Sequence, residues 1–215
     1  MIKDKLEIPN KMAEVSLGQY QKFSKLLNKD SDQDFVNKKM IEIFCGIPLK
    51  EVDKIKYESL LKIIEALSKI FKETPGLKQK FEMNGIKYGF HPQISEMTFG
   101  EFVDLDTFAG DWNTMHKALG ILYRPIIDEF RGSYLIEEYD GTKETYMDKM
   151  PLDVAMGAIF FLSNLRNELM SATLNYSKEE LKRNISQVNK FSGKSGGGIL
   201  RSFHYLEEML QNMKK

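Results

Sequence analysis

Side chains suited to acid–base chemistry gather in one short stretch of the chain. Glu101, Asp104 and Asp106 lie close together, and paired carboxylates are what general acid–base catalysis requires. The stretch opens with Thr98, and a Glu three positions after a Thr is typical of a capping box that starts a helix. Acidic side chains in the first turns also interact favourably with the helix dipole. We therefore interpret Glu101 as a structural cap partner and predict no catalytic residue.

The other potentially reactive residues are scattered. His91, His116 and His204 are far apart in the sequence, and none lies in a metal-binding frame such as His-Glu-x-x-His. Residues 193–195 read Gly-Lys-Ser, but a phosphate-binding loop needs a Gly five positions earlier, where this chain has Val188. We predict no cofactor and no metal, and we expect His116 to be a hydrogen-bonded helix residue.

Composition and charge are those of an ordinary globular protein. The 215 residues are 42% hydrophobic and 29% charged, enough to bury a core without disulfides. Cys45 is the single cysteine, and its apolar neighbours indicate a buried, inert thiol. Because 31 basic residues balance 31 acidic ones, the charge disfavours nucleic-acid binding. The longest apolar run, 154–162, is too short to span a membrane, and no signal peptide is predicted.

A short pattern written twice predicts where two helices begin. Residues 16–20 read Ser-Leu-Gly-Gln-Tyr and residues 98–102 read Thr-Phe-Gly-Glu-Phe. Both are capping boxes, in which the hydroxyl accepts the backbone N–H three positions on and the Gln or Glu reaches back. We predict the N-caps Ser16 and Thr98, with Gln19 and Glu101 as their partners. The aromatic residues that follow, Tyr20 and Phe102, are expected to point inward.

Hydrophobic periodicity predicts further helices in the first half. Apolar residues recur at helical spacing over 20–27, 35–44 and 60–71, with a short helix at 49–55. Gly46 is expected to end the second of these in a left-handed conformation.

The clearest strand signal is a hairpin over 81–90. Asn84 and Gly85 suit the two central positions of a type I′ turn, which need positive φ. Because an isolated hairpin is marginal in water, we expect it to lie on helices or to recruit another strand, which residues 2–9 or 133–139 could provide.

Three features are predicted for the helices of the second half. Asp111 is expected to cap the helix that carries residues 112–123, and Pro125 to kink or end it. Arg124 is expected to be a buried guanidinium paired with an Asp at position 104, 106 or 128. Pro151 is expected in the first turn of a long helix. Its segment 154–162 is apolar on every side, so we expect it to be buried all round and closely crossed where Gly157 and Ala158 are small.

The end of the chain predicts a tethered docking element. Residues 191–198 have the composition of a flexible linker, and an amphipathic helix is predicted over 199–215. We expect this helix to dock in cis or on a partner. Because it is the best candidate docking element, deleting residues 196–215 is expected to abolish partner binding while leaving the fold intact. Its predicted partner-binding residues are Ile199, Leu200, Phe203, Leu206, Met209 and Leu210.

The predicted fold class is mainly α (α+β), a multi-helix bundle with a small antiparallel sheet based on the hairpin. Residues 1–76 are expected to form an N-terminal strand plus a helical subdomain. Residues 77–190 are expected to form the hairpin plus a helical core, in one compact unit with the first part.

Four segments carry a resemblance to proteins of tailed bacteriophages. They are residues 15–20, 96–106, 112–125 and 150–155. The opening, a short strand followed by a Ser-Leu-Gly-Gln-Tyr helix, is similar to the start of tail assembly chaperones. Those are small helical proteins that hold the tape-measure protein during tail construction.

The resemblance implies a non-enzymatic assembly protein that binds another phage protein through apolar helix faces. The implied partner is the tape-measure protein or another tail or virion protein. It implies the host cytoplasm or the virion as location and allows a homo-oligomer. Two alternatives stay open: a structural component of the neck, ring or tail, and a small enzyme or host-interaction protein whose site is assembled by tertiary structure.

Overall fold

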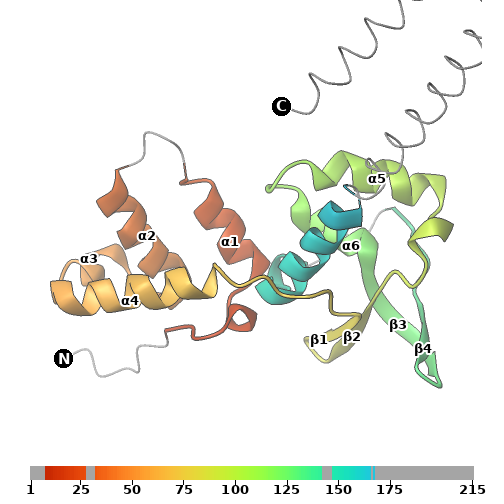
Figure 1. The fold of residues 1–215 in the computed structure, drawn as a ribbon, viewed down its shortest axis with the longest axis horizontal. Helices are drawn as coiled ribbons and strands as arrows, with labels where there is room; N and C mark the ends of the chain where they lie inside the picture. The colour runs from red at the N-terminus through yellow and green to blue at the C-terminus, as the bar shows by residue number, and fades with distance from the viewer. Residues whose placement is uncertain (1–7, 28–31, 142–146, 166, 168–215) are drawn as a thin grey trace, which may run out of the picture. The chain divides into compact units, whose positions relative to one another are not determined.

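The computed structural model describes residues 8–27, 32–141, 147–165 and 167 (Figure 1). Residues 1–163 form one compact unit and residues 164–215 a second, so nearly all described residues belong to the first. Helices and a four-stranded antiparallel sheet make up this unit, which confirms the predicted α+β, mainly helical class. The predicted linker at 191–198 and helix at 199–215 lie outside the described residues.

The helices of the first half follow the predicted periodicity. They are α1 (Leu17–Ser24), α2 (Gln33–Cys45), α3 (Leu49–Val52) and α4 (Tyr57–Ile70). A 3-10 turn that was not predicted, η1 (Met12–Glu14), precedes them. Gly46 ends α2 with φ of 68°, as predicted, because glycine adopts this left-handed conformation without a steric cost.

The sheet is built on the predicted hairpin. Strands β1 (Lys80–Met83) and β2 (Ile86–Phe90) meet at Asn84 and Gly85, whose φ angles are 54° and 77°. Residues 133–136 of the expected segment 133–139 do form a strand of this sheet, but it is not the strand that pairs with the hairpin. The strand beside β2 is β3 (Tyr123–Phe130), and β4 (Ser133–Ile136) pairs with β3 instead. Of the other expected segment, 2–9, residues 2–7 lie outside the described residues, and residues 8 and 9 are not in a strand.

Strands β3 and β4 form an arm. Strand β3 pairs with β2 only over Tyr123–Pro125 and with β4 further along, so the two strands run on together (Figure 1). The Tyr134 ring of β4 reaches back across β3 to Gly89, where any Cβ would collide with it. The Tyr134 hydroxyl donates to the Phe90 carbonyl at 2.6 Å. A glycine at position 89 therefore lets one aromatic side chain tie the arm to the hairpin.

Helices α5 (Phe99–Ala109) and α6 (Met115–Leu122) precede the arm, and the 3-10 turns η2 (Ile94–Glu96) and η3 (Met147–Lys149) flank this region. The helix before Pro125 does end, at Leu122, because the buried Tyr123 begins a strand that pairs with β2. The predicted cap was wrong, since the N-cap of α6 is Thr114. The Asp111 carboxylate instead accepts the Asn113 N–H within the preceding turn.

Both capping boxes form. The Gln19 N–H donates to Ser16 Oγ and the Ser16 N–H donates to Gln19 Oε1. The same two bonds join Thr98 and Glu101. The four predicted cap residues are thus confirmed.

One prediction for the aromatic residues was wrong. Tyr20 is partly buried and packs on the core, whereas the Phe102 side chain is 60% exposed. Helix α5 turns Glu101, Leu105 and Phe108 toward the protein. A residue next to Glu101 lies about 100° further around the helix, so Phe102 faces solvent.

A helix begins at Leu152 and is described to residue 165. Pro151 lies just before it rather than within its first turn, in a bridge with Ser16. The Leu17 N–H donates to the Met150 carbonyl, and the Leu152 N–H donates to the Val15 carbonyl.

The close crossing at position 157 is confirmed. A Cβ on Gly157 would collide with the Gly76 backbone oxygen. Five residues of the helix's first two turns are buried: Leu152, Val154, Ala155, Gly157 and Ala158. Residues 159–162 are only partly buried, so the predicted burial on every side holds only for the beginning of the segment.

Candidate functional site

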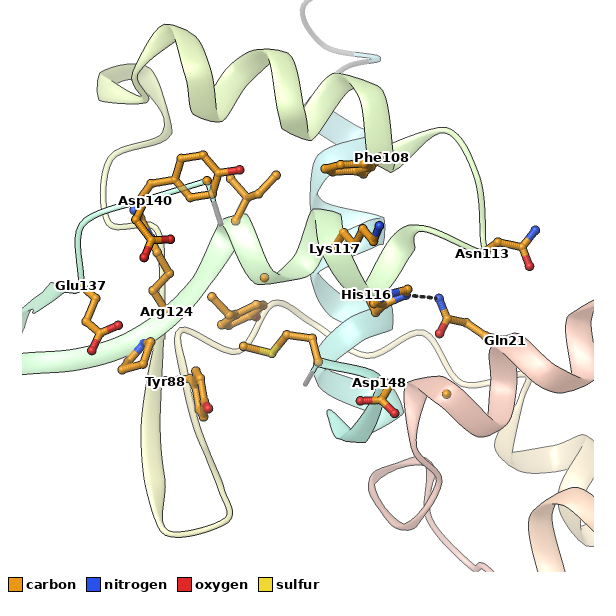
Figure 2. A pocket seen from close by; sticks show the side chains of 18 of the residues that line it. Gln21, Tyr88, Phe108, Asn113, His116, Lys117, Arg124, Glu137, Asp140 and Asp148 are labelled. Carbon is orange, nitrogen blue, oxygen red and sulfur yellow. Dashed lines mark hydrogen bonds between the residues drawn. The ribbon is translucent and has the colours of Figure 1, made fainter. Parts of the chain in front are cut away.

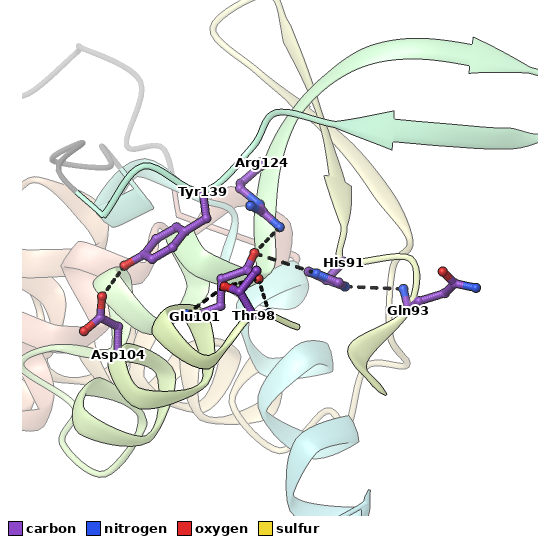
Figure 3. Close-up of polar contacts among 7 residues, drawn as sticks. All are labelled: His91, Gln93, Thr98, Glu101, Asp104, Arg124 and Tyr139. Atoms are coloured by element: carbon purple, nitrogen blue, oxygen red, sulfur yellow. Dashed lines mark hydrogen bonds and ion pairs between the residues drawn. The ribbon is translucent and has the colours of Figure 1, made fainter. Parts of the chain in front are cut away.

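A cluster of buried charged side chains joins α5 to the sheet (Figure 3). The Glu101 side chain lies between Arg124 of β3 and His91, which directly follows β2. Its Oε1 is 2.7 Å from Arg124 Nη2 and 3.8 Å from His91 Nε2. Only 3% of Glu101, 8% of Arg124 and 9% of His91 is exposed. Because buried charges are costly unless they are paired, this geometry fixes the beginning of α5 against the sheet.

The second carboxylate oxygen of Glu101 belongs to the capping box. It accepts the Thr98 N–H at 2.7 Å and the Thr98 hydroxyl at 2.9 Å. Burial alone would raise the pKa of Glu101, but the bonds from Thr98 and the charge of Arg124 outweigh it and lower that pKa. Burial, followed by Arg124, lowers the pKa of His91. The cluster therefore holds an ionised carboxylate beside an imidazole that favours its neutral form.

The predicted partners of Arg124 were wrong. Arg124 is buried as expected, but it pairs with Glu101 rather than with Asp104, Asp106 or Asp128. Asp106 and Asp128 are exposed, and the Asp104 carboxylate accepts the Tyr139 hydroxyl at 2.5 Å. Arg124 pairs with Glu101 because Glu101 lies on the buried face of α5. Burial, and to a lesser degree the hydrogen bond to Asp104, raises the pKa of Tyr139 to about 12.

A pocket of about 1010 Å³ adjoins this cluster. One side is formed by α1 and α6, the other by the sheet and the chain that leaves β4 (Figure 2). The volume is at the upper end of the range of about 300–1,000 Å³ for ligand sites. The side of the pocket formed by helices carries Lys22, Lys25, His116 and Lys117, and the side formed by the sheet carries Tyr88, Arg124, Pro125, Glu137, Glu138, Tyr139 and Asp140.

His116 is the titratable ring on the side formed by helices. Its Nδ1 lies 3.2 Å from Gln21 Nε2, which agrees with the predicted hydrogen-bonded helix residue. Burial and the neighbouring Lys117 lower its pKa. Asp104 and Asp106 do not line the pocket, so the carboxylates considered for catalysis do not converge with His116.

Arg124 belongs to both the cluster and the pocket. Its Nη2 is bound to Glu101, while its buried Nε has no hydrogen-bond partner among the described residues. The Tyr139 ring lies over the guanidinium, 6.0 Å from Cζ. Arg124 thus carries a buried donor that is not paired within the described structure.

The other sequence candidates that the structure describes form no reactive site. Cys45 is partly buried, and burial raises the pKa of its thiol to about 11, as expected of an inert thiol. Within the described ranges, His, Cys, Asp and Glu form no group that could hold a metal ion. In the same part of the chain, no helix is long and apolar enough to cross a membrane. His204 and residues 193–195 lie outside it.

A row of exposed apolar residues on α5 was missed by the sequence analysis. Phe99 is 84% exposed, Phe102 60% and Val103 41%, and their spacing places them on one face of the helix. We call these three residues the α5 row. Their spacing was visible in the sequence, but which face of α5 is buried depends on Glu101 and its partners.

Comparisons with known proteins do not place the chain in a family. No family model, curated protein or solved structure matches it.

Proposed function

We propose that this chain is a non-enzymatic assembly protein of a tailed bacteriophage that binds another phage protein through apolar side chains. The proposal takes its biological setting from the resemblance of residues 15–20, 96–106, 112–125 and 150–155 to phage proteins. By the same resemblance, the proposed partner is the tape-measure protein and the proposed location is the host cytoplasm.

The α5 row carries the proposal. Large apolar side chains are stabilised when they are removed from water, so a group of them exposed on one helix typically marks an interaction surface. Phe99 and Phe102 lie one helical turn apart on the same face of α5. Aromatic side chains contribute much of the binding energy in many interfaces. An amphipathic partner helix could cover such a row. The arm adds three further exposed apolar residues: Ile127, Phe130 and Leu135.

Co-expression with the tape-measure protein of the same genome tests the proposal. The full-length chain should keep that protein soluble and co-elute with it in size-exclusion chromatography. The double variant Phe99→Ser/Phe102→Ser should lose co-elution while its folding stability changes little. Tyr57→Ser is the matched control, because Tyr57 is 75% exposed on α4 and should leave binding intact. Co-elution that survives the double variant would contradict a role for the α5 row.

The same assay also tests the docking helix that the sequence predicts over residues 199–215. The double variant Phe203→Ser/Leu206→Ser should weaken co-elution if residues 199–215 contribute to binding. Unchanged co-elution would remove this helix from the proposed interface.

A structural role in the virion is the second candidate, and it rests on the same apolar surface. Mass spectrometry of purified particles separates the two roles. An assembly chaperone should be absent from mature particles, whereas a neck, ring or tail component should be present in a fixed number of copies.

A further inference from the structure

We propose that β4 (Ser133–Ile136) pairs with the β4 strand of a second copy of this chain, antiparallel and about a two-fold axis at Leu135. The strand order is β1-β2-β3-β4, so among the described residues no strand lies on the outer side of β4 (Figure 1). Such an edge presents backbone N–H and C=O groups that can pair with another chain. The proposal goes beyond the proposed function and does not depend on it, because the tape-measure protein takes no part.

The turn between β3 and β4 fixes which backbone groups of β4 point inward. Its two central residues, Arg131 and Gly132, have φ angles of 49° and 88°, as a type I′ turn requires. Phe130 and Ser133 flank this turn and lie opposite each other. In a two-residue hairpin the flanking pair exchanges its backbone hydrogen bonds, and the direction then alternates along each strand. Ser133 therefore directs its backbone groups toward β3.

A second contact fixes the same alternation at the other end of β4. The Glu137 N–H donates to the Pro125 carbonyl at 2.9 Å, so Glu137 also faces β3. Tyr134 and Ile136 alternate with these inward-facing residues, and their N–H and C=O groups therefore point to the outer edge.

The register centred on Leu135 uses both outward residues of both copies. Tyr134 of one copy would exchange backbone hydrogen bonds with Ile136 of the other, and the two-fold axis repeats that exchange. The two Leu135 residues would face each other as a non-hydrogen-bonded pair, with Cα atoms about 4.5 Å apart. Because Leu135 is 59% exposed in the single chain, this contact would remove apolar surface from water.

Charge complementarity supports the antiparallel orientation. The register places Arg131, at the tip of one arm, beside Glu138, which lies just after β4 in the other copy. Both residues are exposed, and opposite charges that meet across an interface favour one orientation over others. A parallel arrangement would bring the two Arg131 residues together instead. A second copy thus supplies both the apolar and the charged partner that this edge needs.

The two edges of the sheet differ in their protection against pairing. Charged side chains and prolines commonly block a strand edge. Strand β1, at one edge, carries Lys80 and Glu82, whereas the sequence of β4 contains neither a charged residue nor a proline. This difference favours pairing at β4.

Sedimentation velocity of the full-length chain, over a range from about 10 to about 500 μM, tests the proposal. Because so short a strand buries little surface, the dimer belongs to the weak class below about 1,200 Å². The mass of the wild type should therefore rise toward that of a dimer with concentration. Leu135→Lys should remain a monomer, because like charges would face each other on the axis. Ile127→Lys is the matched control, since Ile127 is 62% exposed on β3 of the same arm, and it should dimerise like the wild type.

A charge exchange tests the orientation. Arg131→Glu and Glu138→Arg should each weaken dimerisation, because each places like charges at both contacts of the two-fold dimer. An equimolar mixture of the two variants should restore it, since every contact in the mixed dimer then joins opposite charges. Recovery on mixing also shows that neither variant has lost its fold.

Three results would overturn the inference: a wild type that stays monomeric over the whole range, a dimer that survives Leu135→Lys, or a mixture of the charge variants that dimerises no better than either alone. Each can occur while the tape-measure protein still co-elutes with the chain. Failure of the β4 pairing is therefore distinguishable from failure of the proposed function.

Discussion

The two capping boxes begin two helices in the same way and then serve different purposes. In the first box, the neutral Gln19 also donates from Nε2 to the Ile43 carbonyl, and the aromatic Tyr20 packs on the core. In the second box, the charged Glu101 is buried against Arg124, and the aromatic Phe102 faces solvent. The local pattern sets where a helix starts. The charge of one residue and its distant partners decide which face of that helix is buried.

The largest effect is expected from removing the charge of the second box. Glu101→Gln leaves the Arg124 guanidinium buried without its counter-charge, which should cost about 3–5 kcal/mol of unfolding free energy. Gln19→Ala should cost only about 1 kcal/mol, the ordinary value for a cap. Urea denaturation at neutral pH measures both. Equal losses would mean that the ion pair adds nothing to the second box.

The aromatic residues of the two boxes should differ next. The Tyr20 ring lies 5.0 Å from Trp112 and 5.8 Å from Phe71, between ring centroids. Tyr20→Ala should therefore cost about 2 kcal/mol, whereas Phe102→Ala should stay within about 0.5 kcal/mol of the wild type. Thermal unfolding of the two variants tests this contrast, and a large loss for Phe102→Ala would contradict the exposed position of its ring.

The cap hydroxyl groups should show a smaller difference. Ser16→Ala and Thr98→Ala should each cost about 1 kcal/mol. The loss should be greater for Thr98, because its hydroxyl also donates to the buried Glu101 carboxylate. Urea denaturation should rank the two variants in this order. The reverse order would show that burial of the carboxylate does not strengthen its cap.

The two boxes should also differ in how they respond to acid, because the Glu101 carboxylate can be protonated and the Gln19 amide cannot. Because the pKa of Glu101 is lower in the folded protein than its ordinary value of 4.5, the unfolded chain binds more protons as the pH falls below 4.5. The stabilisation by Glu101 is thus complete above that pH and is lost as the pH falls through the folded-state pKa.

Urea denaturation of the wild type and Glu101→Gln between pH 3 and pH 7 measures this dependence. The variant should show a shallower loss of stability in acid. His91, whose pKa is also lowered, should add a loss that begins below pH 6.5 and persists in Glu101→Gln. Parallel curves for the two proteins below pH 4.5 would exclude Glu101 as a source of acid sensitivity.

Local signals predicted much of the fold. The cap residues, the turn at Asn84 and Gly85, and the left-handed Gly46 follow from rules that involve only a few neighbouring residues. The close crossing at Gly157 could also be anticipated, because small residues in an apolar helix permit it.

Other features depended on contacts that the sequence does not display. The apolar stretch that ends in Tyr123 continues as a strand because that residue pairs with Phe90, far from it in the chain. For the same reason, Arg124 could be predicted to be buried but not to pair with Glu101. The pocket is lined jointly by α1, α6 and the segment after β4, so no single sequence motif predicts it.

The bridge between Ser16 and Pro151 has a consequence for how the chain folds. It fixes the first turn of α1 to the residues that begin the helix at Leu152, across most of the described sequence. Closing so long a loop costs conformational entropy before any contact is gained, and contacts between distant residues slow folding. During synthesis, α1 cannot reach its final anchorage until the ribosome has released Leu152, so the two helix starts should become stable in the same late step.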